Sequence, residues 1–142
     1  MSGDLKDIVE ALAAQIRTNM STAAIAGTTY AFAPNLISPP AAVVIPAPDG
    51  PVSYDDVMDD KDRFNLKIKV LMGAADELSG QQELMQYLGR SGTKSIYAAV
   101  AADPKLGGAC AYAVVTQATA YGDVEWNGQI FFGAELDVEA VT

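Results

Sequence analysis

The stretch Phe64-Asn65-Leu66-Lys67-Ile68-Lys69-Val70-Leu71-Met72 alternates apolar and polar side chains over most of its length. Because successive side chains of a β-strand point to opposite faces, this alternation predicts a strand with one buried face. The side chains expected on that face are Phe64, Leu66, Ile68, Val70 and Met72. Lys67 and Lys69 would lie on the opposite face, so the strand separates a core from a polar surface.

The segment before this strand begins with a helical pattern. Apolar residues recur at i, i+3, i+4 and i+7 over Asp4–Asn19, which predicts an amphipathic helix. Two short β-prone runs follow, at Thr28–Phe32 and Ala42–Ile45. Six of the seven prolines lie around the second run. Since proline cannot donate a backbone hydrogen bond, we expect an edge strand or an ordered extended arm there. The next segment, Pro46–Asp62, is expected to be a long acidic loop.

Two short helices are expected after the strand. The first runs from about Gly80 to Leu88, and the second from about Lys94 to Ala102. Thr93 is a candidate N-cap of the second helix, and Pro104 prevents that helix from continuing.

The C-terminal third is typical of one long β-hairpin. The even-numbered positions of Cys110–Trp126 and of Ile130–Ala140 are mostly apolar, and Asn127-Gly128 marks a turn between them. A two-residue turn would pair even with odd positions and mix the two faces. We therefore predict a three-residue loop with Gly128 left-handed in a bulge, which pairs Val124 with Ile130 and Ala118 with Leu136.

Together these elements predict an α+β fold in a single domain over residues 1–142. The sheet is expected to be largely antiparallel, with helices packed on one face and a long C-terminal β-hairpin. The other face carries lysines on one strand and acidic residues on another: Lys67, Lys69, Glu135, Asp137 and Glu139. If these strands are neighbours, the charges are matched; if they are not, the last strand presents an acidic stripe to a partner or a lumen.

Composition narrows the function classes. The chain has 142 residues and a net charge of −9, and Leu106–Thr142 contains no Lys or Arg. Such a surface repels phosphate, so specific nucleic-acid binding is not expected. No apolar run is long enough to span a membrane. The absence of histidine and the single cysteine, Cys110, remove the commonest general base and metal ligands. We expect no enzyme activity, no metal and no cofactor, and a buried Cys110.

Candidate functional residues are therefore sought in contact surfaces. The densest charge cluster is acidic and comprises Asp55, Asp56, Asp59 and Asp60. A solvated loop is the simplest interpretation; a docking surface and a calcium site are alternatives, although the spacing lacks the EF-hand pattern. Trp126, near the hairpin end, is either an interface anchor or packed within the chain. The remaining candidates for a subunit or partner interface are Pro39, Pro40 and Arg90.

Over nearly its whole length the sequence resembles the tail terminator proteins of long-tailed bacteriophages (siphoviruses), with the closest likeness to phages of actinobacteria. The likeness is carried by the N-terminal helix, by Ser38–Pro46, by Phe64–Leu71 and by the closing hairpin with Gly133-Ala134. Its most distinctive part is Ser95-Ile96-Tyr97-Ala98-Ala99-Val100-Ala101-Ala102-Asp103-Pro104-Lys105-Leu106-Gly107-Gly108.

This resemblance implies a virion structural protein that is assembled in the host cytoplasm and lies at the neck-proximal end of the tail. Such a protein forms a hexameric ring that ends polymerisation of the tail tube and joins it to the head-completion protein of the neck. DNA passes through the lumen without specific binding. The family offers no catalytic residues to transfer. A tail tube or neck subunit is the nearest alternative, and a small α+β ligand-binding or adaptor domain is the non-viral one.

Overall fold

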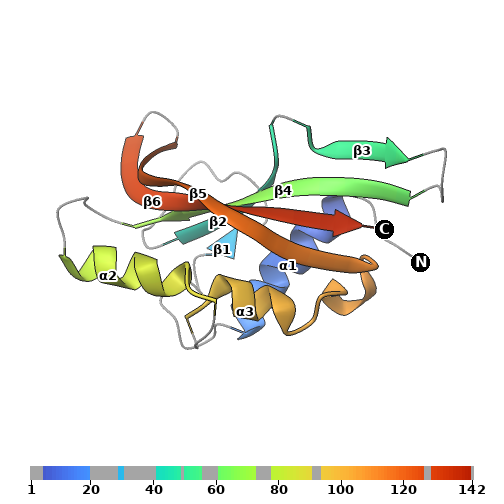
Figure 1. Ribbon diagram of the computed structural model, residues 1–142, viewed down its shortest axis with the longest axis horizontal. Helices are drawn as coiled ribbons and strands as arrows, with labels where there is room; N and C mark the ends of the chain where they lie inside the picture. The colour runs from blue at the N-terminus through green and yellow to red at the C-terminus, as the bar shows by residue number, and fades with distance from the viewer. Residues whose placement is uncertain are drawn as a thin grey trace.

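Strand β4 (Lys61–Leu71) lies at the centre of a six-stranded sheet in the computed structural model (Figure 1). The structure describes residues 5–19, 29–30, 41–48, 50–55, 61–72, 78–90, 94–126 and 129–141. The other strands are β1 (Thr29–Tyr30), β2 (Ala41–Pro46), β3 (Val52–Asp55), β5 (Tyr112–Trp126) and β6 (Gln129–Val141). The helices are α1 (Leu5–Asn19), α2 (Leu78–Tyr87) and α3 (Ile96–Ala101), followed by a 3₁₀ turn, η2 (Leu106–Gly108). The fold is α+β, as predicted.

The sheet has the order β1-β2-β4-β6-β5 and is antiparallel except for the short β1–β2 pair. Phe64 pairs with Val52 of β3 and with Ala140 of β6, so β3 lies on the side of β4 away from β6, in line with β2. Strand β5 therefore forms one lateral edge of the sheet, and β1 and β3 belong to the other.

The helices cover one face of the sheet, which we call the inner face (Figure 1). The alternating residues predicted for β4, from Phe64 to Met72, are all buried there, together with the apolar stripe of α1. The stripe comprises Ile8, Val9, Leu12, Ala13 and Ile16. Among the described residues, no helix is long and apolar enough to cross a membrane.

Two predictions for the proline-rich region are wrong. Strand β2 is not an edge strand, because it lies between β1 and β4; its residues before Pro46 are all free of proline and can pair on both sides. Part of the expected acidic loop is also a strand, since Val52–Asp55 pairs with Lys61–Phe64. The alternation of Val52 and Tyr54 with polar neighbours is a strand pattern that the acidic composition obscured.

The cap of α3 also differs from the prediction. The N-cap is Ser95, not Thr93: its hydroxyl oxygen accepts a hydrogen bond from the Ala98 N–H at 3.0 Å. The same hydroxyl donates to the Gly89 carbonyl at 2.5 Å. Ser95 thus joins the end of α2 to the start of α3.

The hairpin register is partly as predicted. Ala118 pairs with Leu136, but Val124 pairs with Phe131, and Trp126 pairs with Gln129 across a two-residue connection. Two irregularities, between Val115 and Gln117 and between Thr119 and Gly122, each add one residue to β5. Each added residue exchanges the faces of β5. The conformation of Gly128 lies outside the described residues.

Because of these shifts, the side chains of β5 that point to the inner face do not all have even numbers or all have odd numbers. Ala113 and Val115 are buried on the inner face, whereas the even-numbered Tyr112 and Val114, expected inside, are exposed. Near Gly122 and Gly133, which pair, the end of the hairpin bends away from the helices (Figure 1). Val124 there packs with Val43 and Leu71 in a small second cluster.

Candidate functional site

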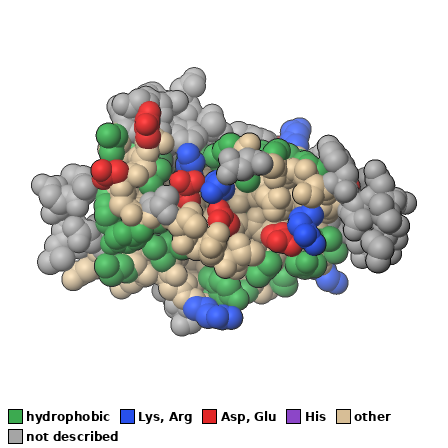
Figure 2. All heavy atoms as spheres, turned by 45° about the horizontal axis from the view of Figure 1, so that its top comes forward, with side chains coloured by type: hydrophobic (Ala, Val, Ile, Leu, Met, Phe, Trp, Pro, Cys, Tyr) green, Lys and Arg blue, Asp and Glu red, His purple; other side chains and the backbone are tan. Residues whose placement is uncertain are grey.

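The outer face of the sheet, opposite the helices, carries a charge ladder between β4 and β6. Lys67 Nζ lies 3.0 Å from Asp137 Oδ1 and 3.6 Å from Glu135 Oε1. Arg63 Nε lies 3.1 Å from Glu139 Oε1 at the more exposed end. Figure 2 shows basic and acidic side chains next to one another on this face. Of the two alternatives left by the sequence, the matched one is confirmed: β4 and β6 are neighbours, and the acidic residues of β6 face cations.

Lys67 is the more enclosed of the two cations in this ladder, Lys67 and Arg63. Its hydrogen bond to Asp137 raises its pKa above the ordinary value of 10.5, against the opposing effect of burial. The side chain is therefore an ammonium ion at neutral pH and has no free electron pair to act as a base or nucleophile. Its role in this arrangement is electrostatic.

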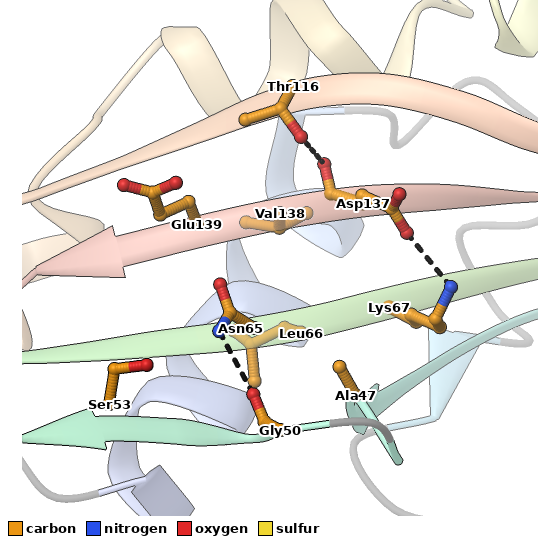
Figure 3. Close-up of a pocket in the computed structure, with 10 residues that line it drawn as sticks. All are labelled: Ala47, Gly50, Ser53, Asn65, Leu66, Lys67, Thr116, Asp137, Val138 and Glu139. Carbon is orange, nitrogen blue, oxygen red and sulfur yellow. Dashed lines mark hydrogen bonds and ion pairs between the residues drawn. The ribbon is translucent and has the colours of Figure 1, made fainter.

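A shallow polar groove of about 430 Å³ lies beside Lys67 (Figure 3). It forms because the chain leaves the sheet at Ala47 and rejoins it at Pro51, both hydrogen-bonded to the backbone of Asn65. The Asn65 amide donates to the Gly50 carbonyl at 2.9 Å and holds this excursion in place. On the opposite wall, the Thr116 hydroxyl donates to the Asp137 carbonyl at 3.2 Å. The Asn65 and Thr116 side chains in the walls of the groove are thus already hydrogen-bonded to backbone carbonyl groups.

The groove's chemistry is that of a neutralised polar surface. Within the described part of the chain, no three metal-ligating side chains come together. The charges of Lys67 and Asp137 neutralise each other, and the side chains of Asn65 and Thr116 donate hydrogen bonds to backbone carbonyl groups. This arrangement suits contact with another polar surface better than proton transfer.

A second feature lies at the β5 edge of the sheet, which we call the β5 groove. An apolar groove of about 220 Å³ runs between α3 and β5, lined by Tyr97, Val100, Ala101, Pro104 and residues 112–115. A smaller one, of about 170 Å³, continues past Tyr97 along β5 towards Ala118. Beside them Tyr112 and Val114 are exposed on the outer face. The β5 groove therefore combines apolar surface with a strand edge that pairs with no further strand among the described residues.

Arg90 lines the β5 groove on its helical side, and two further cations flank α3. The Arg90 guanidinium lies 5.0 Å from the Tyr97 ring centroid and donates to the Tyr97 hydroxyl at 3.3 Å. Lys94 Nζ lies 3.6 Å from Glu83 Oε1. Lys105 is exposed after Pro104. Lys94 precedes α3, Lys105 follows it, and Arg90 contacts Tyr97 within it. Strands β5 and β6 contain no Lys or Arg.

The structure describes only some of the residues that the sequence predicted for an interface. Arg90 lies at the β5 groove, as above. Asp55 ends β3, and its backbone pairs with Lys61. Trp126 ends β5 with its backbone opposite Gln129, and its side chain lies outside the described residues. The predicted positions that lie outside the described residues altogether are Pro39, Pro40, Asp56, Asp59 and Asp60.

Cys110 is buried, as predicted. Burial, and to a lesser degree the nearby Asp103 carboxylate, raises the pKa of its thiol. The sulfur lies 3.7 Å from the Pro104 carbonyl oxygen, to which the thiol donates. The thiol is therefore held in its protonated form within the core.

Sequence reasoning missed the β5 groove. Its residues are spread over two elements that the topology alone brings together, and the bulges in β5 reverse which side chains are exposed. The exposure of Tyr112 and Val114 could have been recognised from the sequence only if the apolar–polar alternation of the strand were broken near them. The run Ala111–Val115 shows no such break.

No protein-family model matches this chain, and no curated protein is significantly similar to it.

Proposed function

We propose that this protein is a virion structural subunit that forms a ring at the end of a phage tail tube, terminates tube polymerisation and joins the tail to the neck. The proposal starts from the sequence resemblance to tail terminators. One structural observation supports it most: the sheet formed by the described residues is open at both lateral edges, with β5 at one and β3 at the other.

An open sheet of this kind suits a closed ring. Free strand edges are sites at which other chains add, and a head-to-tail ring needs two different complementary surfaces on each subunit. Here the two edges differ in length and composition. Strand β5 has 15 residues and an apolar groove beside it, whereas β3 has 4 residues and leads into an acidic connection.

The charge of the chain fits a lumen through which DNA slides. Six copies at −9 each would carry −54, and a like-charged wall discourages adhesion of the duplex. The matched ladder on the outer face leaves no concentrated positive field there that would hold phosphate. The proposed ring therefore contacts DNA without binding it specifically.

The purified protein and the tube protein of the same phage provide the test. Light scattering should give a mass six times that of the chain, and addition of the protein to polymerising tube protein should stop elongation. A subunit that forms long polymers alone would instead be a tube protein. A stable monomer that leaves tube growth unchanged would contradict the proposal and favour the small-domain alternative.

A further inference from the structure

We infer that the β5 groove accepts strand β3 of a second copy of this chain, which extends the sheet from one subunit into the next. This inference rests on the proposed ring and names the contact that closes it. The acceptor is the edge of β5 that faces away from β6, with the apolar groove next to α3, and the donor is the edge of β3 that faces away from β4. Neither edge pairs with another strand within the described part of the chain.

The strand directions favour this pairing. Strand β3 is antiparallel to β4, β4 to β6, and β6 to β5, so β3 and β5 of one sheet run in opposite directions. In a head-to-tail contact between sheets that face the same way, β3 of one copy therefore meets β5 of the next as an antiparallel neighbour. Antiparallel pairs are the slightly more stable kind.

The two edges also lie at the same level of the sheet. Ser53 pairs with Arg63, Arg63 with Val141, and Val141 with Tyr112, so one row of residues crosses the sheet from β3 to β5. Displacement of a copy along this row brings its Ser53 to the region of Tyr112. The Ala113 N–H is already bonded to the Pro104 carbonyl, so the acceptor begins just beyond that residue.

The groove beside β5 fits the inner face of such a strand. Val52 of β3 packs on the inner face, and Ser53 is exposed on the outer one. A β3 strand added to β5 would place Val52 over the apolar groove lined by Tyr97 and Val100, and Ser53 beside the exposed Val114. Val52 would therefore meet an apolar surface, and Ser53 would lie on the exposed outer face.

Charge complementarity selects a second copy as the occupant. Lys105 adjoins the start of β5, because the Pro104 carbonyl accepts a hydrogen bond from the Ala113 N–H and the Lys105 carbonyl accepts one from the Cys110 N–H. Antiparallel pairing with Ser53 beside Val114 places Asp55 near Tyr112, so the acidic end of β3 would meet a cation that the same chain carries. Opposite charges at a rim steer the register of a contact more than they strengthen it.

Disulfide trapping tests the contact directly. The Ser53→Cys/Val114→Cys double variant, incubated with oxidised glutathione, should give a ladder of covalent multimers on a non-reducing gel. Each single variant should give at most dimers. The matched control is Ser53→Cys/Ile130→Cys, because Ile130 is 71% exposed but lies at the far end of the hairpin, and it should give no ladder.

A charge exchange provides the second measurement. Lys105→Asp and Asp55→Lys should each weaken self-association about twofold to fivefold, the range of a rim ion pair, and the double variant should restore it. Rings that form without a disulfide ladder and without this rescue would overturn the β3–β5 contact and leave the ring proposal standing. A protein that stays monomeric would overturn both.

Discussion

Lys67 and Asp137 face each other across β4 and β6, with 3.0 Å between the ammonium nitrogen and the nearer carboxylate oxygen. Their side chains are only 20% and 25% exposed, so water screens the pair less than it would a surface ion pair. The same carboxylate also accepts a hydrogen bond from the Gln117 amide of β5 at 2.9 Å. Asp137 thus links the three strands β4, β6 and β5 on the outer face.

Replacement of Lys67 by methionine should lower the free energy of unfolding by about 1–2 kcal/mol, because Asp137 and Glu135 would be left partly buried without their cation. Urea denaturation measures this loss. Lys105→Met, on an exposed surface, should change stability by less than about 0.5 kcal/mol. A double-mutant cycle with Asp137→Asn isolates the pair, and a coupling energy of zero would contradict its role.

Stability should also fall at high pH because of Lys67. Its pKa is raised in the folded state, first by the hydrogen bond to Asp137, so its contribution is complete below the unfolded value of 10.5. That contribution disappears as the pH rises through the folded value. The difference in stability between wild type and Lys67→Met should therefore be constant at neutral pH and shrink above 10.5. A difference that persists undiminished would argue against this assignment.

Gly133→Ala should be strongly destabilising for its size. A Cβ at this position would collide with the Val70 carbonyl oxygen and lie 3.1 Å from the carbonyl carbon, so the backbones of β4 and β6 would have to separate. Overpacking of this kind costs about 1–3 kcal/mol. Thermal denaturation measures the effect, with the exposed Asp123→Ala as the control. Equal melting temperatures for the two variants would show that the strands can move apart freely.

Ser95→Ala should lower stability by about 1–3 kcal/mol, because it removes the N-cap of α3 and leaves the partly buried Gly89 carbonyl without its donor. Ser53→Ala on the outer face is the matched control. Urea denaturation of both variants checks the prediction. If Ser95→Ala were as stable as the control, a water molecule would have to replace both hydrogen bonds.

Cys110 should not react with a thiol reagent in the folded protein at neutral pH. Only 5% of the residue is exposed, and burial raises the pKa of its thiol, so little thiolate is available. Absorbance after addition of a disulfide reagent should rise only when denaturant is added. Immediate stoichiometric labelling of the native protein would contradict the burial of this residue.

The local patterns were sufficient for the α+β class, the α1 stripe, the buried face of β4 and the core position of Cys110, since each depends on periodicity within one segment. The register of the hairpin was not predictable in the same way. The two-residue connection and the two bulges compensate over part of the hairpin, so Ala118 meets Leu136 as predicted while Tyr112 and Val114 face outwards. Alternation in sequence cannot show where an extra residue is inserted.

Periodicity was therefore enough to find α1, β4 and the two strands of the hairpin, and to assign the apolar side chains that α1 and β4 bury, because helical and strand periods are local properties of the chain. Only the tertiary structure decided that β4 lies beside β6, so that Lys67 neutralises Asp137, and that β5 ends the sheet next to α3. Those relationships join residues about 70 positions apart for Lys67 and Asp137. They arise because strand order is set by packing of the whole sheet against its helices, and no single segment contains that information.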